Sequence, residues 1–161
     1  MLRNNRQPMK NYFAYGSNLL RSQMELRCPD HIFVGVATLQ GHRFLIGERG
    51  FATVAEDGAS KVSGALYRIS ETDEASLDFH EGVARGSYRK AIVAVVSAGS
   101  EVHALTYIDD HIAPARPRAG YLEKIAKGAA ERGLPADYIT FLCSFERLQT
   151  PTEIRGFNGR D

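Results

Sequence analysis

Short apolar runs separated by glycine and proline predict a set of β-strands in the first two thirds of the chain. Residues 12–15 form an apolar run that stops at Gly16-Ser17-Asn18, which indicates a buried strand ending in a tight loop. A second strand is expected over His31–Leu39, because Pro29 ends the preceding element. Its alternating apolar face carries Ile32, Val34 and Val36. Further strands are expected at 42–47, 51–55, 62–69, 87–97 and 101–109, the last two as a hairpin.

Helical spacing and capping signals predict two helices among these strands. A short helix is expected over about 20–27, after the first loop. Ser70, with Asp73 three residues later, resembles a capping box. This pattern predicts a helix over 71–80 that stops at Gly82.

Two more helices are expected near the C-terminal end. Apolar side chains recur at helical spacing over Ala119–Arg132, and Gly133 has the character of a C-cap residue. Pro135 is expected to open a second helix that runs through Leu148. Because the strands cluster early and the helices late, the predicted fold class is α+β rather than a doubly wound sheet.

The chain length indicates how these elements are organised into domains. A chain of 161 residues and 17.8 kDa fits a single domain with a core of its own. Residues 1–10 are polar and without periodicity, so they are expected to form a flexible leader. The domain is then expected over 11–148, and Gly156 and Gly159 suggest a loose tail over 149–161.

Composition and charge narrow the class of partner. Hydrophobic residues make up 43% of the chain and charged residues 24%, which is typical of a globular protein. The 20 Lys and Arg against 19 Asp and Glu give a net charge of +1, which disfavours nucleic acid and membranes as partners and favours small molecules. No apolar run approaches the roughly 18 residues of a membrane span, so a cytoplasmic location is expected. Cys28 and Cys143 belong to no C-x-x-C pair and are expected to be buried, reduced thiols.

Common catalytic and metal-binding motifs are absent from the sequence. There is no phosphate-binding glycine loop and no G-x-S-x-G nucleophile motif. The 5 histidines are scattered, and Ala84 stands where a zinc protease helix that contained His80-Glu81 would need its second histidine. The sequence therefore predicts no metal centre.

Two segments have the residue types of a binding and catalytic site. In Tyr15–Leu19, Gly16 allows close approach of a ligand to the backbone, and the loop amides can bind a carboxylate or an oxyanion. Glu81 is expected at the C-terminal end of the 71–80 helix. There the helix dipole, and burial if it occurs, would raise the pKa of its carboxyl group toward that of a general base.

Several motifs follow one another in a fixed order along the chain. They are Y-F-A-Y-G-S-N-L-L over 12–20, S-L-D-x-x-E-G-V over 76–83 with G-x-Y at 86–88, Y-L-E-K-I over 121–125, and G-A-x-x-x-G-L-P-x-x-Y over 128–138. Shorter matches are Gln23-Met24, Arg27-Cys28-Pro29, Ala52-Thr53-Val54 and Gly64-Ala65-Leu66-Tyr67. In this order, over about residues 11–148, the motifs resemble the γ-glutamylcyclotransferase family.

The resemblance implies a fold and a site. The implied fold is a single α+β domain built on a small, mostly antiparallel β-barrel with flanking helices. Glu81 would be the catalytic acid and base. The residues implied to bind a γ-glutamyl substrate are Tyr15, Gly16, Ser17, Asn18 and Leu19 of the loop, and the tyrosines Tyr88, Tyr107 and Tyr121.

The implied reaction is the closure of a γ-glutamyl amide on its own α-amine, which releases 5-oxoproline and an amine or amino acid. It needs no enzyme nucleophile and no cofactor. Two other functions stay open: a cyclotransferase that acts on γ-glutamylamines or on glutamyl-protected biosynthetic intermediates, and a non-catalytic module that binds a small metabolite. The near-neutral charge and the habit of the family also allow a homodimer.

The sequence departs from the family pattern in two places. The segment between the second strand and Ala52 is short. The segment Ile112–Arg118 contains Ala-Pro-Ala-Arg-Pro-Arg where relatives often have a Pro-Ser-Pro-like run. Both are expected to border the mouth of the pocket, on the side of the leaving group.

Overall fold

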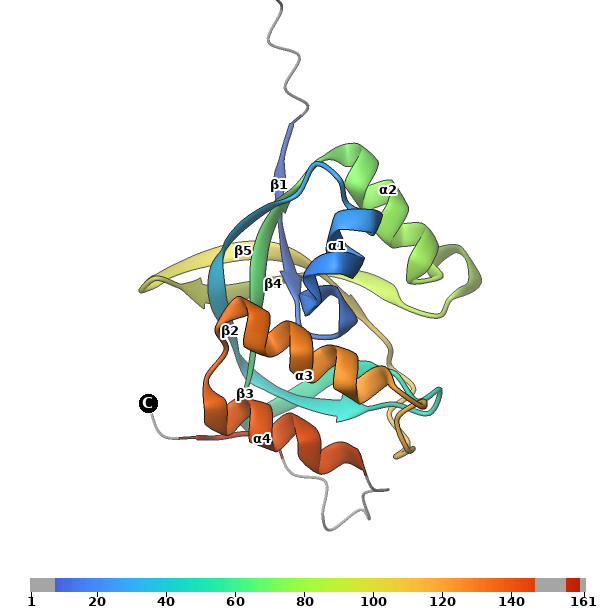
Figure 1. The fold of residues 1–161 in the computed structure, drawn as a ribbon, viewed down its shortest axis with the longest axis vertical. Coiled ribbons are helices and arrows are strands. Elements are labelled where there is room, and N and C mark those ends of the chain that lie inside the picture. Colours follow the sequence, from blue (N-terminus) through green and yellow to red (C-terminus); the bar gives the residue numbers. More distant parts are fainter. Residues whose placement is uncertain (1–7, 147–155, 160–161) are drawn as a thin grey trace, which may run out of the picture.

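A closed β-barrel forms the centre of the molecule in the computed structural model, which describes residues 8–146 and 156–159. The barrel strands are β1 (Lys10–Ala14), β2 (Ile32–Ile46), β3 (Ala52–Ile69), β4 (Arg89–Ser97) and β5 (Ser100–Ile108). They lie in the order β1-β3-β2-β4-β5, and all neighbours are antiparallel except β1 and β5, which close the barrel in parallel. The fold is therefore the α+β barrel that the resemblance implied, and β4 and β5 form the predicted hairpin (Figure 1).

Four of the predicted strands join into two long ones. The segments 31–39 and 42–47 form the single strand β2, in which the pairing shifts between Gln40 and His42 and Gly41 has φ of +72°. The segments 51–55 and 62–69 likewise form β3. Glycine and polar residues mark irregular points in long, curved strands here, where the sequence suggested breaks.

The alternating apolar face predicted over Ile32, Val34 and Val36 is buried only in part, and Val36 is the residue of this face that packs against the core. Ile32 is 55% exposed and Val34 is 50% exposed, while Ala37 and Leu39 point into the core. The register shifts between Phe33 and Gly35. An irregularity of one residue moves the opposite set of side chains to the barrel interior, because the side-chain period of a strand is two.

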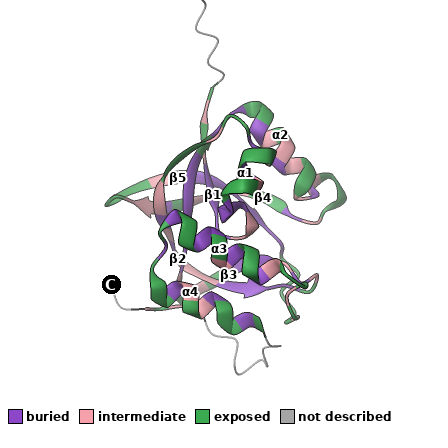
Figure 2. Ribbon diagram, in the orientation of Figure 1, coloured by how far each residue is buried: buried purple, intermediate pink, exposed green. Residues whose placement is uncertain are grey.

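Helices cover one side of the barrel and its ends (Figure 1). They are η1 (Ser17–Leu19), α1 (Arg21–Arg27), α2 (Glu71–His80), η2 (Val83–Arg85), α3 (Tyr121–Arg132), α4 (Ala136–Cys143) and η3 (Ser144–Glu146). In Figure 2 the helices carry buried positions on the side that faces the barrel and exposed positions on the other. None of the described helices is long and apolar enough to cross a membrane.

The local signals at the helix ends are confirmed. The Ser70 hydroxyl accepts a hydrogen bond from the Asp73 N–H at 3.1 Å, and the Asp73 carboxylate accepts one from the Ser70 N–H at 3.2 Å. These two bonds form the predicted capping box of α2. Gly133 ends α3 with φ of +81°, and Pro135 precedes α4.

The C-terminal part differs from the prediction in three respects. The helix α4 ends at Cys143, and Leu148, where it was expected to end, lies outside the described residues, as do 1–7 of the leader. Cys28 is buried as expected, whereas Cys143 is exposed, because it lies on the outer face of the helix. Phe157, from the predicted loose tail, packs its ring on the core, and its carbonyl accepts a hydrogen bond from Lys61 at 2.8 Å.

Candidate active site

A pocket of about 220 Å³ opens at the end of β1, between the η1 loop, the end of α2 and the start of β3. Seven of the eight predicted substrate-binding residues and Glu81 line it. The predicted residues in its lining are Tyr15, Gly16, Ser17, Asn18, Glu81, Tyr88, Tyr107 and Tyr121. Further lining residues are Tyr12, Phe13, Ala14, Gln23, Arg27, Arg49, Phe51, Ala52, His80, Arg85, Ser87, Thr106 and Lys124. The topology thus brings together residues from both ends of the sequence.

Glu81 reaches the pocket because the chain turns sharply at the end of α2. Its N–H closes the last helical turn on the Leu77 carbonyl at 2.8 Å. Gly82 then takes a left-handed conformation, with φ of +64°, and its carbonyl accepts hydrogen bonds from Arg85 and Ser87. A Cβ on Gly82 would lie 2.9 Å from the Ser87 Cβ, so this compact turn requires glycine. The E-G-V motif therefore has a conformational cause as well as a chemical one.

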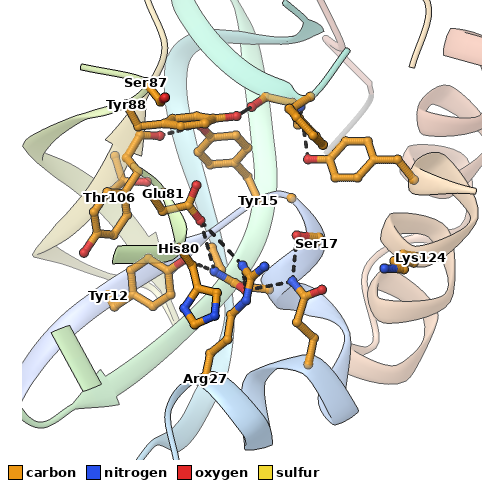
Figure 3. A pocket seen from close by; sticks show the side chains of 18 of the residues that line it. Tyr12, Tyr15, Ser17, Arg27, His80, Glu81, Ser87, Tyr88, Thr106 and Lys124 are labelled. Carbon is orange, nitrogen blue, oxygen red and sulfur yellow. Dashed lines mark hydrogen bonds and ion pairs between the residues drawn. The ribbon is translucent and has the colours of Figure 1, made fainter. Parts of the chain in front are cut away.

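The Glu81 carboxylate is only 18% exposed and points into the pocket (Figure 3). Burial raises the pKa of Glu81 above its ordinary value. The charges of Arg27 and Arg49 oppose that rise, and so does a hydrogen bond from Asn18. The raised pKa was expected from the end of the helix and from burial, and burial is the largest cause in the structure.

Asn18 connects Glu81 to its surroundings. Its Nδ2 donates to the Tyr12 hydroxyl at 2.9 Å and lies 3.5 Å from Glu81 Oε1. Its Oδ1 accepts hydrogen bonds from Gln23 at 3.0 Å and from Arg27 Nη1 at 3.1 Å. Arg27 Nη1 also lies 3.9 Å from Glu81 Oε1. With both ends of its amide group engaged, Asn18 fixes the position of the carboxylate.

The helix α3 contacts the loop at the point where the chain passes from η1 into α1. The Arg132 Nε donates to the Leu19 carbonyl at 3.2 Å. A Cβ on Gly128 would lie 2.4 Å from the Leu20 N, so only glycine allows α3 to approach the loop this closely. Leu19 itself is completely buried and does not line the pocket. The structure therefore does not bring the Leu19 side chain to the pocket with the other predicted residues, because that side chain packs in the core beneath α3.

The tyrosine hydroxyls hold the pocket wall in place. Tyr88 donates to the Ala52 carbonyl at 2.7 Å, and Tyr121 accepts from the Ala52 N–H at 3.0 Å. Tyr107 donates to Asp78 Oδ1 at 2.7 Å, and its carbonyl accepts from the Tyr15 hydroxyl. Burial raises the pKa of each of these four tyrosines, so they are neutral hydrogen-bonding groups.

Gly16 matters in this loop because it has no side chain, and not because of its backbone angles. Its φ is −117°, which is outside the left-handed region. A Cβ at this position would lie 3.3 Å from the Tyr121 hydroxyl and 3.5 Å from the Ala52 Cβ. The missing side chain therefore lets the Tyr121 hydroxyl and the Ala52 side chain pack directly against the backbone of the loop, where a Cβ would be crowded.

Cationic residues at the pocket were missed by the sequence argument. Arg27 belongs to a segment that resembles the family, but no role was assigned to it, and Arg49 lies in the short segment before Ala52. Arg85 and Lys124 lie at the exposed part of the lining. The short segment before Ala52 could have indicated that Arg49 lies at the pocket. A short connection between two strands keeps its side chains near the end of the barrel.

Among the described residues, no group of three or more His, Cys, Asp or Glu side chains is arranged to hold a metal ion. His80 lines the pocket, but its Nδ1 is paired with the Ser76 carbonyl of the preceding helical turn at 2.8 Å. Glu81 is the one carboxylate in the described lining of the pocket. The arrangement can therefore exchange protons at one buried carboxyl group while binding an anionic ligand.

Comparisons with known proteins identify the family of this chain. The model of the AIG2-like family matches residues 61–142. A gamma-glutamylcyclotransferase from Mus musculus is 35% identical over 156 residues, covering 90% of this chain and 81% of its own length, and one from Homo sapiens is 34% identical, covering 79% and 73%. A solved structure named gamma-glutamyl cyclotransferase superposes with a TM-score of 0.82 at 31% identity, covering 89% of this chain and 92% of its own. This chain belongs to the γ-glutamylcyclotransferase family.

Proposed function

We propose that this protein is a γ-glutamylcyclotransferase that converts a γ-glutamyl amide into 5-oxoproline and a free amino acid or amine. The observation that carries the proposal is Glu81, a buried carboxyl group with a raised pKa beside the Tyr15–Asn18 loop. A carboxyl group whose pKa is raised is a stronger base than an ordinary carboxylate, which suits it to take up and return protons. The relatives that carry the enzyme's name are similar over most of the chain.

The nucleophile is the α-amine of the substrate. It closes a five-membered lactam on the γ-carbonyl carbon, and the bond from that carbon to the leaving nitrogen breaks. Binding the substrate in a folded form supplies an effective molarity on the order of 10⁵ to 10⁸ M, so no enzyme nucleophile is needed. The reaction is an acyl transfer within one molecule.

Glu81 moves the protons. It takes a proton from the α-ammonium group, which makes the amine nucleophilic, and it returns a proton to the leaving nitrogen. The α-nitrogen gives up two protons in all, and the leaving amine takes up two to become an ammonium ion. The reaction therefore balances without water and without a cofactor.

The developing oxyanion would be stabilised by backbone N–H groups of Gly16, Ser17 and Asn18. The first N–H groups of a helix such as η1 have no partner inside the helix. One such donor, aimed at the oxyanion, lowers the activation free energy by about 3–4 kcal/mol. Gly16, Ser17 and Asn18 all line the pocket in which the γ-carbonyl would lie.

The test measures products from γ-glutamyl-alanine in ¹⁸O-labelled water. We expect unlabelled 5-oxoproline and alanine, and no release from the α-linked isomer or from the N-acetyl derivative, whose nitrogen is not basic. Labelled glutamate as the first product would replace the proposal with hydrolysis by a water molecule that Glu81 activates. Binding of the compounds without release of any product would instead identify a non-catalytic binding module.

A further inference from the structure

Arg49 is held rigidly at the pocket by residues that follow β5 and α2. Its Nε and Nη2 donate to Asp109 Oδ2 at 3.2 Å and 3.0 Å. Nη2 also donates to the Ser87 carbonyl at 3.0 Å, and the guanidinium lies 5.1 Å from the centre of the Tyr88 ring. Four contacts thus fix the plane of a side chain that is 37% exposed. A surface arginine without a structural task seldom has so many.

The Asp109 carboxylate that holds Arg49 is itself held in place by His111. Its side chain is 4% exposed, and its Oδ1 accepts hydrogen bonds from the His111 N–H at 3.0 Å and from His111 Nδ1 at 2.8 Å. Burial raises the pKa of Asp109, but the hydrogen bonds from His111 and Arg49 outweigh it and hold the pKa below its usual range. Asp109 therefore remains charged and keeps Arg49 in one orientation.

One nitrogen of the guanidinium is left for a ligand. The contacts above use Nε and Nη2, and Nη1 has no hydrogen bond or ion pair with any residue in the described ranges 8–146 and 156–159. Nη1 carries two N–H groups, and either can donate to a carboxylate oxygen. Because the other two nitrogens are already fixed, little side-chain entropy is lost when Nη1 binds an anion.

The two segments in which the sequence departs from its family build the support for Arg49. The Arg118 Nε donates to the Arg49 carbonyl at 2.9 Å, and the Arg118 N–H donates to the Gly50 carbonyl at 3.1 Å. Gly50 has φ of +82°, and a Cβ there would lie 2.9 Å from the Arg118 Cγ. The short turn before β3 and the 112–118 segment thus pack into one unit at the pocket.

Arg27 and Arg49 belong to different walls of the pocket. Arg27 contacts Asn18 and Glu81, on the side of the loop that takes the glutamyl group. Arg49 contacts Ser87 and lies over the Tyr88 ring, on the wall made by the turn after α2. Both arginines line the same pocket, so a substrate whose glutamyl part lies against the loop can place its leaving group against this second wall.

We propose that Arg49, oriented by Asp109, binds a carboxylate on the leaving amine. The inference rests on the proposed function and assigns the contact of its leaving group: Arg49 selects a substrate with a free carboxylate close to the scissile amide over a γ-glutamylamine. Arg49 is the specificity-determining residue and Asp109 is its positioning residue. Arg85 and Lys124 add positive charge at the exposed part of the same lining, which favours entry of an anion.

The test compares γ-glutamyl-alanine with γ-glutamyl-alaninamide, which has the same shape but no carboxylate. In the wild-type protein we expect kcat/KM for the alanine compound to be about tenfold to a hundredfold higher, the range of a hydrogen bond to a charged group. In Arg49→Met this ratio should fall to within about threefold of one. In Asp109→Asn the ratio should also fall, and the change should lie in KM for the alanine compound rather than in kcat.

Arg89→Met is the matched control. Arg89 pairs with Asp110 at 2.6 Å on the exposed surface and does not line this pocket, so its loss should leave the ratio unchanged. A wild-type ratio near one, or a high ratio that survives Arg49→Met, would overturn the proposal. A fall of kcat/KM by the same factor for both substrates in Asp109→Asn would show a structural role only.

The proposed function can fail separately, if wild-type protein releases 5-oxoproline from neither compound. Binding of both compounds would then be measured by calorimetry on the wild-type protein and on Arg49→Met. Tighter binding of the alanine compound that Arg49→Met abolishes would support the carboxylate contact. Equal binding of the two compounds to wild-type protein would refute it.

Discussion

Replacing Glu81 with glutamine should abolish turnover and leave the fold intact. Glutamine has the shape of glutamate, and its carbonyl can still accept the hydrogen bond from Asn18. It cannot accept or release a proton in the range where the enzyme works. The substitution therefore removes the proposed chemistry of this position while it preserves the packing.

The size of the effect follows from the composition of the pocket. Glu81 is the one carboxylate in the described lining, and His80 is turned back to its own helix by the Ser76 carbonyl. No other carboxylate in this lining can replace the base, so the loss should reach the range for general acid and base catalysis. That range is about 10² to 10⁴ in kcat, or about 3–5.5 kcal/mol in the activation free energy.

The stability of the variant gives a second, independent readout. Because burial raises the pKa of Glu81 in the folded state, ionisation of this group disfavours folding. Its contribution to stability is present at low pH and is lost as the pH rises through the folded-state pKa. Glu81→Gln should therefore be at least as stable as wild-type protein at pH 8, and the difference should shrink as the pH falls.

The assay measures release of 5-oxoproline at saturating substrate, with Tm at pH 5 and pH 8. Glu123→Gln, an exposed change of the same type on α3, is the control and should behave as wild-type protein. Folded Glu81→Gln that retains more than about a tenth of the wild-type kcat would refute the catalytic role of Glu81. A variant that loses its thermal transition would show that the carboxylate is needed for folding, against the reasoning above.

Three further variants test the surroundings of the carboxylate. In Arg27→Met the loss of a nearby positive charge should raise the pKa of Glu81 further, so the acid limb of the kcat/KM profile should move to higher pH; an unmoved limb would contradict the assignment. Gly16→Val should raise KM, because the new side chain enters the space before the Tyr121 hydroxyl, 3.3 Å from the position of a Cβ; an unchanged KM would exclude a binding role for this loop. Gly128→Ala should lower the free energy of unfolding by about 1–3 kcal/mol, measured by urea denaturation, because its Cβ would lie 2.4 Å from a backbone nitrogen; wild-type stability would show that α3 can move away from the loop without cost.

Elements with local signals could be predicted from the amino-acid sequence. The capping box of Ser70 and Asp73 and the glycine after Glu81 act within a few residues, and both ends of α2 were predicted correctly. The hairpin of β4 and β5 was likewise readable from two apolar runs around a short turn. The motifs also indicated the family, and with it the closed barrel that periodicity alone does not reveal.

Which side chains face the pocket depends on long-range packing and could not be predicted from local patterns. Leu19 lies within the motif of the loop, yet it is core, because α3 approaches it from more than a hundred residues away through Arg132. The exposed start of β2 depends on a register shift that pairing with β3 creates. Such outcomes depend on long-range packing, which leaves no periodic signal in the segment itself.

The charges that surround Glu81 also could not be predicted from the sequence alone. Glu81 could be chosen from its motif, but Arg27 and Arg49 reach it from two other elements, and they oppose the pKa shift that burial causes. Arg49 lies 60 positions before Asp109, and only the closed barrel brings the two together. Local sequence determines the conformation of a segment because its hydrogen bonds are near neighbours, whereas the charge around a buried group depends on residues that meet only when the chain has folded.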